Sequence, residues 1–216
     1  FAEYYMNKHP DVNITVSESG SGNGAKALIN AACDVATMSR PMKNSEMKAA
    51  QEAGILPIEH IVAMDGIALA VHPSNPLANL TIEKIRDIYT GKIRNWKELG
   101  GADAEIRLYG RENSSGTYTY LHDEVVKDDY ASTVQSLPGT AAVVNAVKKD
   151  VNGIGYGGAA YAVGVKYAKV KKDANSTAYI PSPESIAKSE YPITRYLYMY
   201  LRNRPTGETK KYIDWI

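Results

Sequence analysis

The sequence predicts an α/β protein, and three observations carry this prediction. The chain of 216 residues is 44% apolar and 23% charged, which is the composition of an ordinary globular protein. Short apolar runs alternate along the chain with segments whose apolar residues recur at helical spacing. No low-complexity tract, long linker or clear internal repeat interrupts this alternation. Strands that alternate with helices in this way are typical of α/β folds.

Each predicted helix or strand follows from the pattern of residues within its own segment. Branched apolar residues between polar ones indicate strands, and apolar residues three and four apart indicate helices. The helix that follows Leu80 is the best defined, because Thr81 is a good N-cap, Glu83 lies in the first turn and Gly91 ends the pattern. The predicted elements are, in order, strand 12–16, helix 24–32, strand 35–38, helix 45–53, an apolar run over 58–71, helix 81–91, strand 106–109, helix 117–126, helix 141–149, strand 196–201 and helix 206–216.

Charge and residue counts exclude several classes of function. Lys plus Arg is 25 and Asp plus Glu is 24, so the net charge of +1 gives no field that attracts nucleic acid or an anionic membrane. No stretch approaches the roughly 20 apolar residues that span a bilayer. The single Cys33 excludes an internal disulfide framework, and the four histidines lack ligand spacing. We therefore expect no metal, no cofactor and no nucleic-acid partner.

A glycine-rich segment at 19–26 is the first candidate binding feature. It is predicted to lie between a strand and a helix, where glycines let backbone N–H groups converge and the helix start favours negative charge. Ser21 adds a hydroxyl. The glycine spacing matches neither the dinucleotide fingerprint nor the P-loop. An anion cradle and a turn that only permits tight packing both remain open for this segment.

A second segment, at 109–117, repeats the arrangement. Here Arg111 supplies a guanidinium that binds tetrahedral oxyanions bidentately, and Ser115, Gly116 and Thr117 supply hydroxyl and amide donors. Helix capping by Ser115 and a surface ion pair between Arg111 and Glu112 are the alternatives. Two such segments in a neutral protein favour one small anion held from two sides, at the carboxyl ends of strands.

Two further positions are candidates. Ser39 and Arg40 follow the strand 35–38, where a turn with a solvated arginine is the commoner outcome. Asp65 interrupts the apolar run 58–71 and is followed by glycine. A buried carboxylate needs a partner, and a proton carried by a ligand and a structural hydrogen bond are equally good candidates.

Several motifs together resemble a known family. They are Gly20-Ser-Gly-Asn-Gly-Ala-Lys-Ala-Leu, Ala36-Thr-Met-Ser-Arg-Pro, Met64-Asp-Gly-Ile-Ala-Leu-Ala-Val, Leu80-Thr-Ile-Glu-Lys-Ile-Arg-Asp-Ile-Tyr-Thr-Gly-Lys-Ile-Arg-Asn-Trp, Arg111-Glu-Asn-Ser-Ser-Gly-Thr and Gly153-Ile-Gly-Tyr. In this order, over essentially the whole chain, the sequence resembles the periplasmic or lipoprotein phosphate-binding proteins that feed ABC phosphate importers.

The resemblance implies a two-lobed type II periplasmic-binding-protein fold, in which each lobe is a mixed sheet flanked by helices and two strands form a hinge. The crossings would be 61–72 and 192–201. The discontinuous first lobe would then be 1–70 with 195–216, and the second lobe 71–194. Relatives normally begin with a strand and a loop that caps the first helix, so the chain is expected to start inside that helix and to end before the segment that packs back on the first lobe. Part of the family's binding site would then be missing.

The resemblance also assigns roles to residues of this sequence. Ser21 would donate to phosphate from the first lobe, and Arg111, Ser115, Gly116 and Thr117 from the second. Ser39 falls where some members carry a proton-accepting aspartate, which leaves Asp65 as the acceptor and Arg40 as an extra cation or a support. Asn113 stands where relatives have an aspartate that pairs with the arginine, so Arg111 is expected to be less neutralised than theirs.

The implied function is capture of inorganic phosphate in the cleft between the lobes and delivery to the permease of an ABC importer, without catalysis. The implied location is extracytoplasmic, in the periplasm or as a cell-surface lipoprotein, with the signal segment absent from this chain, and the implied state is a monomer. A phosphate scavenger or surface protein without transport, a homologue that has lost binding, and a phosphoryl-handling enzyme are the alternatives.

Overall fold

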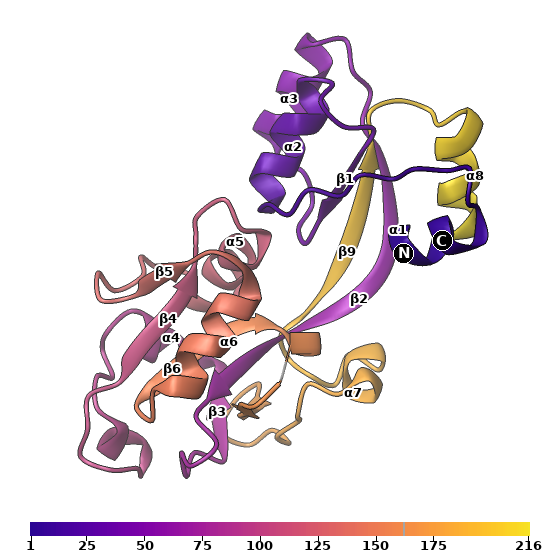
Figure 1. The fold of residues 1–216 in the computed structure, drawn as a ribbon. Helices are drawn as coiled ribbons and strands as arrows, with labels where there is room; N and C mark the ends of the chain where they lie inside the picture. Colours follow the sequence, from indigo (N-terminus) through magenta and orange to yellow (C-terminus); the bar gives the residue numbers. More distant parts are fainter. Residues whose placement is uncertain (162) are drawn as a thin grey trace. The chain divides into compact units, whose positions relative to one another are not determined.

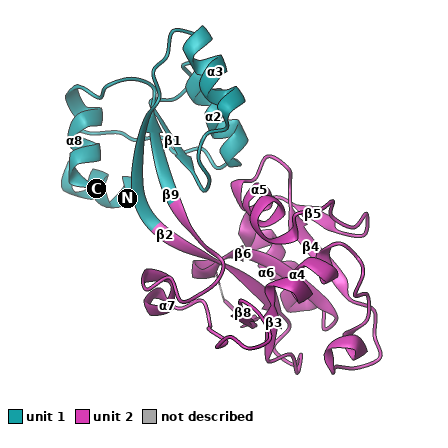
Figure 2. Cartoon of the chain, turned by 180° about the vertical axis from the view of Figure 1, so that it is seen from behind, with its two compact units in different colours: residues 1–63, 197–216 teal, residues 64–196 magenta. Residues whose placement is uncertain are grey.

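The computed structural model describes residues 1–161 and 163–216 and confirms an α/β fold (Figure 1). The chain forms two compact units, coloured separately in Figure 2: unit 1 is Phe1–Ala63 with Leu197–Ile216, and unit 2 is Met64–Tyr196. Strands β2 (Ile58–Val71) and β9 (Thr194–Leu201) each contribute residues to both units. That the predicted lobes, 1–70 with 195–216 and 71–194, close around a ligand stays a prediction.

Unit 1 contains helices on strand β1 (Val35–Met38) and on parts of β2 and β9. The helices are α1 (Ala2–Lys8), α2 (Ser21–Ile29), α3 (Asn44–Glu52) and α8 (Gly207–Trp215). Strand β1 pairs antiparallel with β9, with Val35 opposite Leu201 and Met38 opposite Tyr198. Small and flexible side chains of α2 and β1 pack here against Tyr198 and Tyr200. On α1, the buried Tyr5 stacks edge-on against Trp215 of α8 and donates from its hydroxyl to Glu208.

Unit 2 is larger and is built on a mixed sheet. Its strand order is β2-β6-β4-β5; β6 is antiparallel to β2, whereas β4 is parallel to both β6 and β5. A short parallel pair, β3 with β8, lies outside this sheet, and β7 pairs with β2. The elements of unit 2 are β3 (Asn79–Thr81), α4 (Ile82–Tyr89), η1 (Trp96–Leu99), β4 (Arg107–Arg111), α5 (Gly116–Leu121), η2 (His122–Val126), β5 (Gln135–Leu137), α6 (Gly139–Lys149), β6 (Gly153–Gly158), η3 (Ala159–Tyr161), β7 (Lys166–Tyr167), β8 (Lys169–Lys171) and α7 (Pro183–Ala187).

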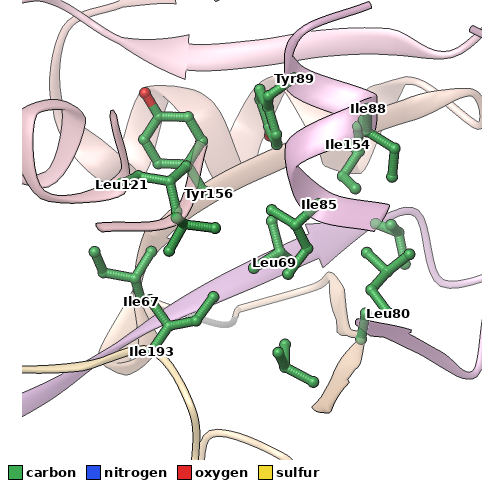
Figure 3. Close-up of a cluster of buried hydrophobic side chains, with 14 of the residues drawn as sticks. Ile67, Leu69, Leu80, Ile85, Ile88, Tyr89, Leu121, Ile154, Tyr156 and Ile193 are labelled. Atoms are coloured by element: carbon green, nitrogen blue, oxygen red, sulfur yellow. The ribbon is translucent and has the colours of Figure 1, made fainter. Parts of the chain in front are cut away.

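The sheet of unit 2 is covered on both faces, which explains why the second half of β2 reads as a continuous apolar run. Ile67 and Leu69 belong to the main core with Ile85 and Ile88 of α4, as Figure 3 shows. Ala70 points to the opposite face, where it belongs to a cluster with the valines of α6. Alternate residues of one strand therefore serve two cores, as the two-residue period of a strand requires.

Helix α6 packs closely on β6 because that strand is rich in glycine. A Cβ atom at Gly155 would lie 2.5 Å from Cγ1 of Val143 and 2.9 Å from Cγ2 of Val147, both on α6. We predict that Gly155→Ala lowers the free energy of unfolding by about 1–3 kcal/mol, because the helix must shift. Urea unfolding measures this. The control is Gly24→Ala in α2, where the nearest atoms are 3.7 Å away. It should be neutral or stabilising, and an equal loss in both variants would contradict the packing argument.

Most predicted elements are present, with boundaries that shift by a few residues. Thr81 is the N-cap of α4, and its hydroxyl oxygen accepts from the amide of Lys84. The single helix predicted over 117–126 is instead α5 followed by a π-helical turn, which ends at Lys127 with a left-handed backbone.

The strand predicted over 12–16 is wrong, because these residues form no regular strand. A strand is stable only when a neighbour completes its hydrogen-bond ladder, and no strand among the described residues pairs with this segment. Instead, residues 12–17 line one side of a cavity of about 550 Å³, and residues 35–37 of β1 line another. Residues 12–16 do alternate between apolar and polar types, but this alternation alone does not provide a neighbouring strand to pair with.

Candidate functional site

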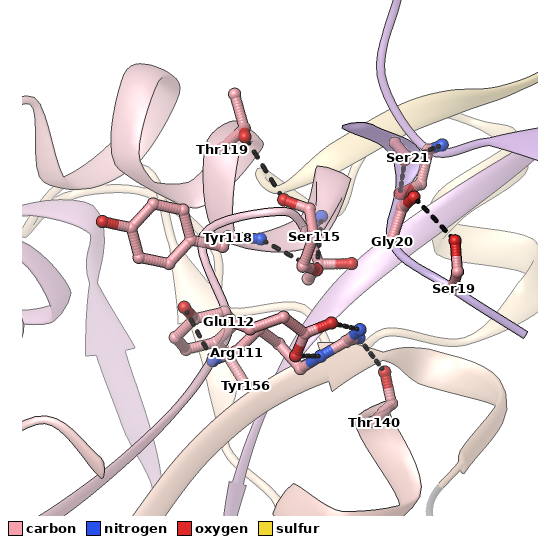
Figure 4. A network of polar contacts seen from close by, with 12 residues as sticks. Ser19, Gly20, Ser21, Arg111, Glu112, Ser115, Tyr118, Thr119, Thr140 and Tyr156 are labelled. Atoms are coloured by element: carbon pink, nitrogen blue, oxygen red, sulfur yellow. Dashed lines mark hydrogen bonds and ion pairs between the residues drawn. The ribbon is translucent and has the colours of Figure 1, made fainter. Parts of the chain in front are cut away.

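Unit 2 places the predicted second anion segment at the end of β4, where the side chain of Arg111 lies in a polar network (Figure 4). Nε and Nη2 of Arg111 donate to the carboxylate of Glu112 over 3.3 and 3.0 Å. Nη1 donates to Oγ1 of Thr140 over 3.0 Å, and the backbone amide donates to the hydroxyl of Tyr156 over 3.2 Å. Glu112 and Thr140 thus hold the guanidinium from two directions before any ligand binds, and Tyr156 holds the backbone of the same residue.

The network leaves the arginine with donors to spare. A guanidinium has five N–H hydrogens, two on each terminal nitrogen and one on Nε. Three are engaged by Glu112 and Thr140, so one hydrogen on Nη1 and one on Nη2 have no acceptor in the described part of the chain. These two nitrogens form the end of the fork, which suits two oxygens of a tetrahedral anion.

Glu112 is the partner that neutralises Arg111. Its side chain is 31% exposed and that of Arg111 is 11% exposed, so the pair is largely buried, unlike the surface pair considered from the sequence. Burial raises the pKa of Glu112, but the hydrogen bonds and the charge of Arg111 outweigh it and hold the pKa below its usual value. Glu112 therefore neutralises Arg111 at least in part, and the expectation that Arg111 is less neutralised than the arginine of relatives, because residue 113 is asparagine, stays a prediction.

Ser115, Gly116 and Thr117 are brought together at the start of α5. Ser115 is the N-cap, and its hydroxyl oxygen accepts from the amides of Thr117 and Tyr118 over 3.2 and 3.4 Å. The capping alternative is therefore confirmed for Ser115. Capping uses the oxygen of the hydroxyl and leaves its hydrogen free for a further acceptor. All three residues are buried, so their polar groups are already shielded from bulk water.

Asp65 is paired with a residue that the sequence patterns did not single out. Oδ2 of Asp65 accepts from Nη2 of Arg195 over 2.9 Å and from Nε over 3.2 Å. The side chains are 17% and 5% exposed. A structural partner, one of the two alternatives for Asp65, is therefore present. Its second oxygen, Oδ1, has no hydrogen-bond donor among the described residues, so a role as proton acceptor stays a prediction.

In unit 1 the structure brings Ser21 and Ser39 together. The amide of Ser39 donates to Oγ of Ser21 over 3.1 Å, and the two hydroxyl oxygens lie 3.3 Å apart. The glycine-rich segment differs from its prediction, because α2 begins at Ser21 and takes Gly22 and Gly24 into the helix. Gly24 faces β1, where a Cβ atom would lie 3.7 Å from Ala36 and from Thr37, so there is room for a side-chain methyl group. Ser21 stands at the first helical position.

Arg40 is engaged inside unit 1. Its terminal nitrogens donate to both carboxylate oxygens of Glu46 over 2.8 and 2.7 Å, and Nη1 also donates to the carbonyl of Pro41. This geometry ties residue 40 to the start of α3 and differs from a solvated turn. Of the two roles considered for Arg40, these contacts favour support of the loop that carries Ser39.

The pair between Arg40 and Glu46 makes a testable contribution to stability. Burial raises the pKa of Glu46, but the bonds to Arg40 outweigh it and lower that pKa. A lowered pKa stabilises the fold above the unfolded value of about 4.3, and this stabilisation is lost as the pH falls through the folded value. We predict that Glu46→Gln costs about 2 kcal/mol at neutral pH and less near pH 3, because protonation of Glu46 removes the charge of the pair as the pH falls.

Urea unfolding of the wild-type protein and of Glu46→Gln, at neutral pH and at pH 3, measures the difference in the free energy of unfolding. The control is Glu52→Gln on the same helix, whose ion pair with Lys48 spans 3.9 Å between side chains that are 68% and 78% exposed. It should change stability by less than about 0.5 kcal/mol. A cost of Glu46→Gln that is the same at both pH values would contradict the ion-pair explanation.

Sequence reasoning missed Arg195 and Thr140, which contact the predicted residues from distant parts of the chain. The sequence does contain a signal for Arg195, because this charged residue directly precedes the apolar run 196–201. No local sequence feature marks Thr140 as a contact of Arg111. The described residues hold no group of three or more Asp, Glu, His or Cys side chains arranged for a metal. Within the same residues, every helix is too short or too polar to cross a bilayer.

Comparison with known proteins gives one consistent result. The family described as the PBP superfamily domain matches residues 1–216. A phosphate-binding protein PstS from Pseudomonas aeruginosa is 34% identical over 95% of this chain and 68% of its own length. A phosphate-binding protein PstS from Bacillus subtilis is 31% identical over 100% of this chain and 69% of its own length.

Solved structures that are similar to this chain also come from phosphate transport systems. A structure from Clostridium perfringens, described as a candidate phosphate ABC transporter substrate-binding protein with bound phosphate, is 33% identical with a TM-score of 0.89, over 100% of this chain and 85% of that one. An ABC-type phosphate transport receptor from Vibrio cholerae is 28% identical with a TM-score of 0.76, over 99% and 86% of the two chains.

Proposed function

The chain belongs to the PBP superfamily, as a relative of the PstS phosphate-binding proteins, and we propose that it binds inorganic phosphate for an ABC importer. The predicted fold class, the type II periplasmic-binding-protein fold, is confirmed by the solved relatives. The relatives are named as binding proteins and transport receptors rather than enzymes, so binding without catalysis is the function that we assign.

The free fork of Arg111 is the observation that carries this proposal. One N–H on each terminal nitrogen is uncommitted, while Glu112 and Thr140 fix the plane of the guanidinium. Charge-assisted hydrogen bonds of this kind contribute about 1.5–3 kcal/mol each. The hydroxyl hydrogens of Ser115 and Thr117 and the amide of Gly116 supply further donors near the start of α5. Donors without a net positive field suit one small anion rather than a polyanion.

Asp65 supports selectivity for an anion that carries a proton. Its Oδ1 has no donor from the described residues, and phosphate near neutral pH brings an O–H that this oxygen accepts. A fully ionised anion such as sulfate would place lone pairs against lone pairs, at a cost of about 1–3 kcal/mol or more. Ser21 and Ser39 form a second donor pair in unit 1. That both donor sets serve one anion stays a prediction.

Titration calorimetry with phosphate, sulfate and molybdate tests the proposal. We expect phosphate to bind in preference to sulfate by about tenfold or more. Equal affinity for phosphate and sulfate would remove the acceptor role of Asp65, and binding of neither would remove the function.

Delivery to an importer is the finer part of the proposal. We propose the permease of an ABC phosphate importer as the partner, an extracytoplasmic location, and a monomer that binds no nucleic acid. Uptake of labelled phosphate by cells or vesicles that hold the permease, with and without this protein, measures coupling. Phosphate binding without stimulated uptake would indicate a scavenger instead.

A further inference from the structure

Arg195 is a buried arginine whose hydrogen bonds are incomplete. It lies on β9 at the boundary of unit 2, and its side chain is 5% exposed. Nε and Nη2 donate to Asp65, and Nη2 also donates to Oγ1 of Thr117 over 3.0 Å. Nη1 is buried and has no hydrogen-bond partner in the described part of the chain. Both hydrogens of Nη1 are therefore unsatisfied in an environment where water does not reach them.

An unsatisfied buried donor on a charged group is unfavourable, so its presence needs a reason. The ion pair with Asp65 does not explain it, because the carboxylate of Asp65 accepts hydrogen bonds from Nε and Nη2 and makes no contact with Nη1. A carbonyl or hydroxyl of the protein in reach of Nη1 would have satisfied it, as the carbonyl of Pro41 does for Arg40. The arrangement is the one expected of a donor reserved for a ligand atom.

Arg195 also determines how Thr117 bonds. A threonine hydroxyl has one hydrogen to donate and two lone pairs. Because Nη2 of Arg195 occupies one lone pair of Thr117, the hydroxyl hydrogen must point elsewhere, toward another acceptor. Arg195 therefore orients one of the anion donors of α5 directly. It also lies close enough to Arg111 for the two charges to interact, since Arg111 is among the groups that lower the pKa of Arg195, after burial.

We propose that Arg195 is a second guanidinium of the oxyanion site, which donates to the ligand from Nη1 and fixes the hydroxyl of Thr117 as a donor. This inference rests on the proposed function and adds a binding residue to it. Arg111 and Arg195 then contact the anion from β4 and β9, each neutralised in advance by its own carboxylate, Glu112 or Asp65. The two pairs carry no net charge, so recognition comes from directed N–H groups.

Calorimetric titration with phosphate tests this on the wild-type protein and on Arg195→Lys and Arg195→Gln. Lysine keeps the charge but loses the planar fork, and we expect affinity to fall by about 10-fold; glutamine should lower it by about 100-fold. The matched control is Arg86→Gln in α4, whose Nε donates to the carbonyl of Val125 in the same unit. Its affinity should equal that of the wild type.

Three further variants separate binding from folding. The pair Asp65→Asn with Arg195→Gln removes both charges, so neither partner is left as an unpaired ion, and Asp65→Asn alone is its reference. We expect the double variant to bind phosphate about 10-fold or more weakly than Asp65→Asn. Arg195→Ala should recover affinity when millimolar guanidinium is added, a rescue that a purely structural arginine would not give in a folded variant.

The outcomes distinguish this inference from the function on which it rests. Wild-type protein that binds no oxyanion overturns both. Wild-type protein that binds phosphate, with folded Arg195 variants of unchanged affinity, overturns the role of Arg195 alone and leaves phosphate binding intact. Weakened phosphate binding in the glutamine and lysine variants, with rescue of the alanine variant by guanidinium, supports it.

Discussion

Replacing Arg111 by glutamine is expected to weaken phosphate binding by about 100-fold or more. The substitution removes the charge and the two uncommitted N–H groups at the end of the fork. Two charge-assisted hydrogen bonds at about 1.5–3 kcal/mol each account for a loss of this size. Titration calorimetry on the intact chain gives the affinity, and circular dichroism shows whether the variant is folded.

Arg107 provides a matched control on the same strand. It lies four residues before Arg111 on β4, its side chain is 63% exposed, and its nearest carboxylate, on Asp150, is 3.7 Å away. Arg107→Gln should leave phosphate affinity unchanged. If both variants bound phosphate as tightly as the wild type, Arg111 would be only the partner of Glu112, and its assignment to the site would be wrong.

Replacing Asp65 by alanine is expected to lower the free energy of unfolding by about 3–5 kcal/mol, the largest loss of stability that we predict. Asp65 is the carboxylate partner of Arg195, and the arginine side chain is 5% exposed. Without the carboxylate of Asp65, the guanidinium of Arg195 stays buried with no counter-charge and with Nη1 already unsatisfied. Urea unfolding at neutral pH measures the loss.

An exposed aspartate of the same unit serves as the comparison. Asp103 pairs with Lys97 over 3.0 Å, and its side chain is 71% exposed. Asp103→Ala should cost about 1 kcal/mol or less, because solvent screens the pair. A small loss for Asp65→Ala would mean that water or a shift of Arg195 compensates the charge, and the buried ion pair would then not stabilise unit 2.

Buried arginines in this protein share one arrangement. Each arginine considered for the anion site is paired with a carboxylate before a ligand arrives: Arg40 with Glu46, Arg111 with Glu112 and Arg195 with Asp65. Pairing offsets the cost of burying a guanidinium and fixes its plane, so that the unpaired hydrogens keep a defined direction. All three retain N–H hydrogens without an acceptor among the described residues, but only Arg111 and Arg195 lie beside the hydroxyl groups of unit 2, Thr140 and Thr117 respectively. Pre-organisation of this kind lowers the entropy lost on binding.

The α/β class, most of the helices and strands, and the segments that carry anion donors could all be predicted from the amino-acid sequence. Periodicity and capping are local properties, so Thr81 at the start of α4 and the apolar alternation of β2 could be read from neighbouring residues. The motif order was specific enough to identify the family. Ser21, Ser39, Arg111, Ser115 and Thr117 were found because their segments combine glycine, hydroxyl and guanidinium groups at short spacing.

Which groups contact one another depends on how distant parts of the chain pack together. Asp65 and Arg195 are 130 residues apart, and Arg195 and Thr117 are 78 apart, so no local pattern joins them. The segment 12–16 has the alternation of a strand but finds no partner strand among the described residues, and Ser115 proved to be a helix cap as well as a candidate donor. Local sequence sets what each residue is able to bond, whereas long-range packing sets which bonds are made and which N–H groups are left for a ligand.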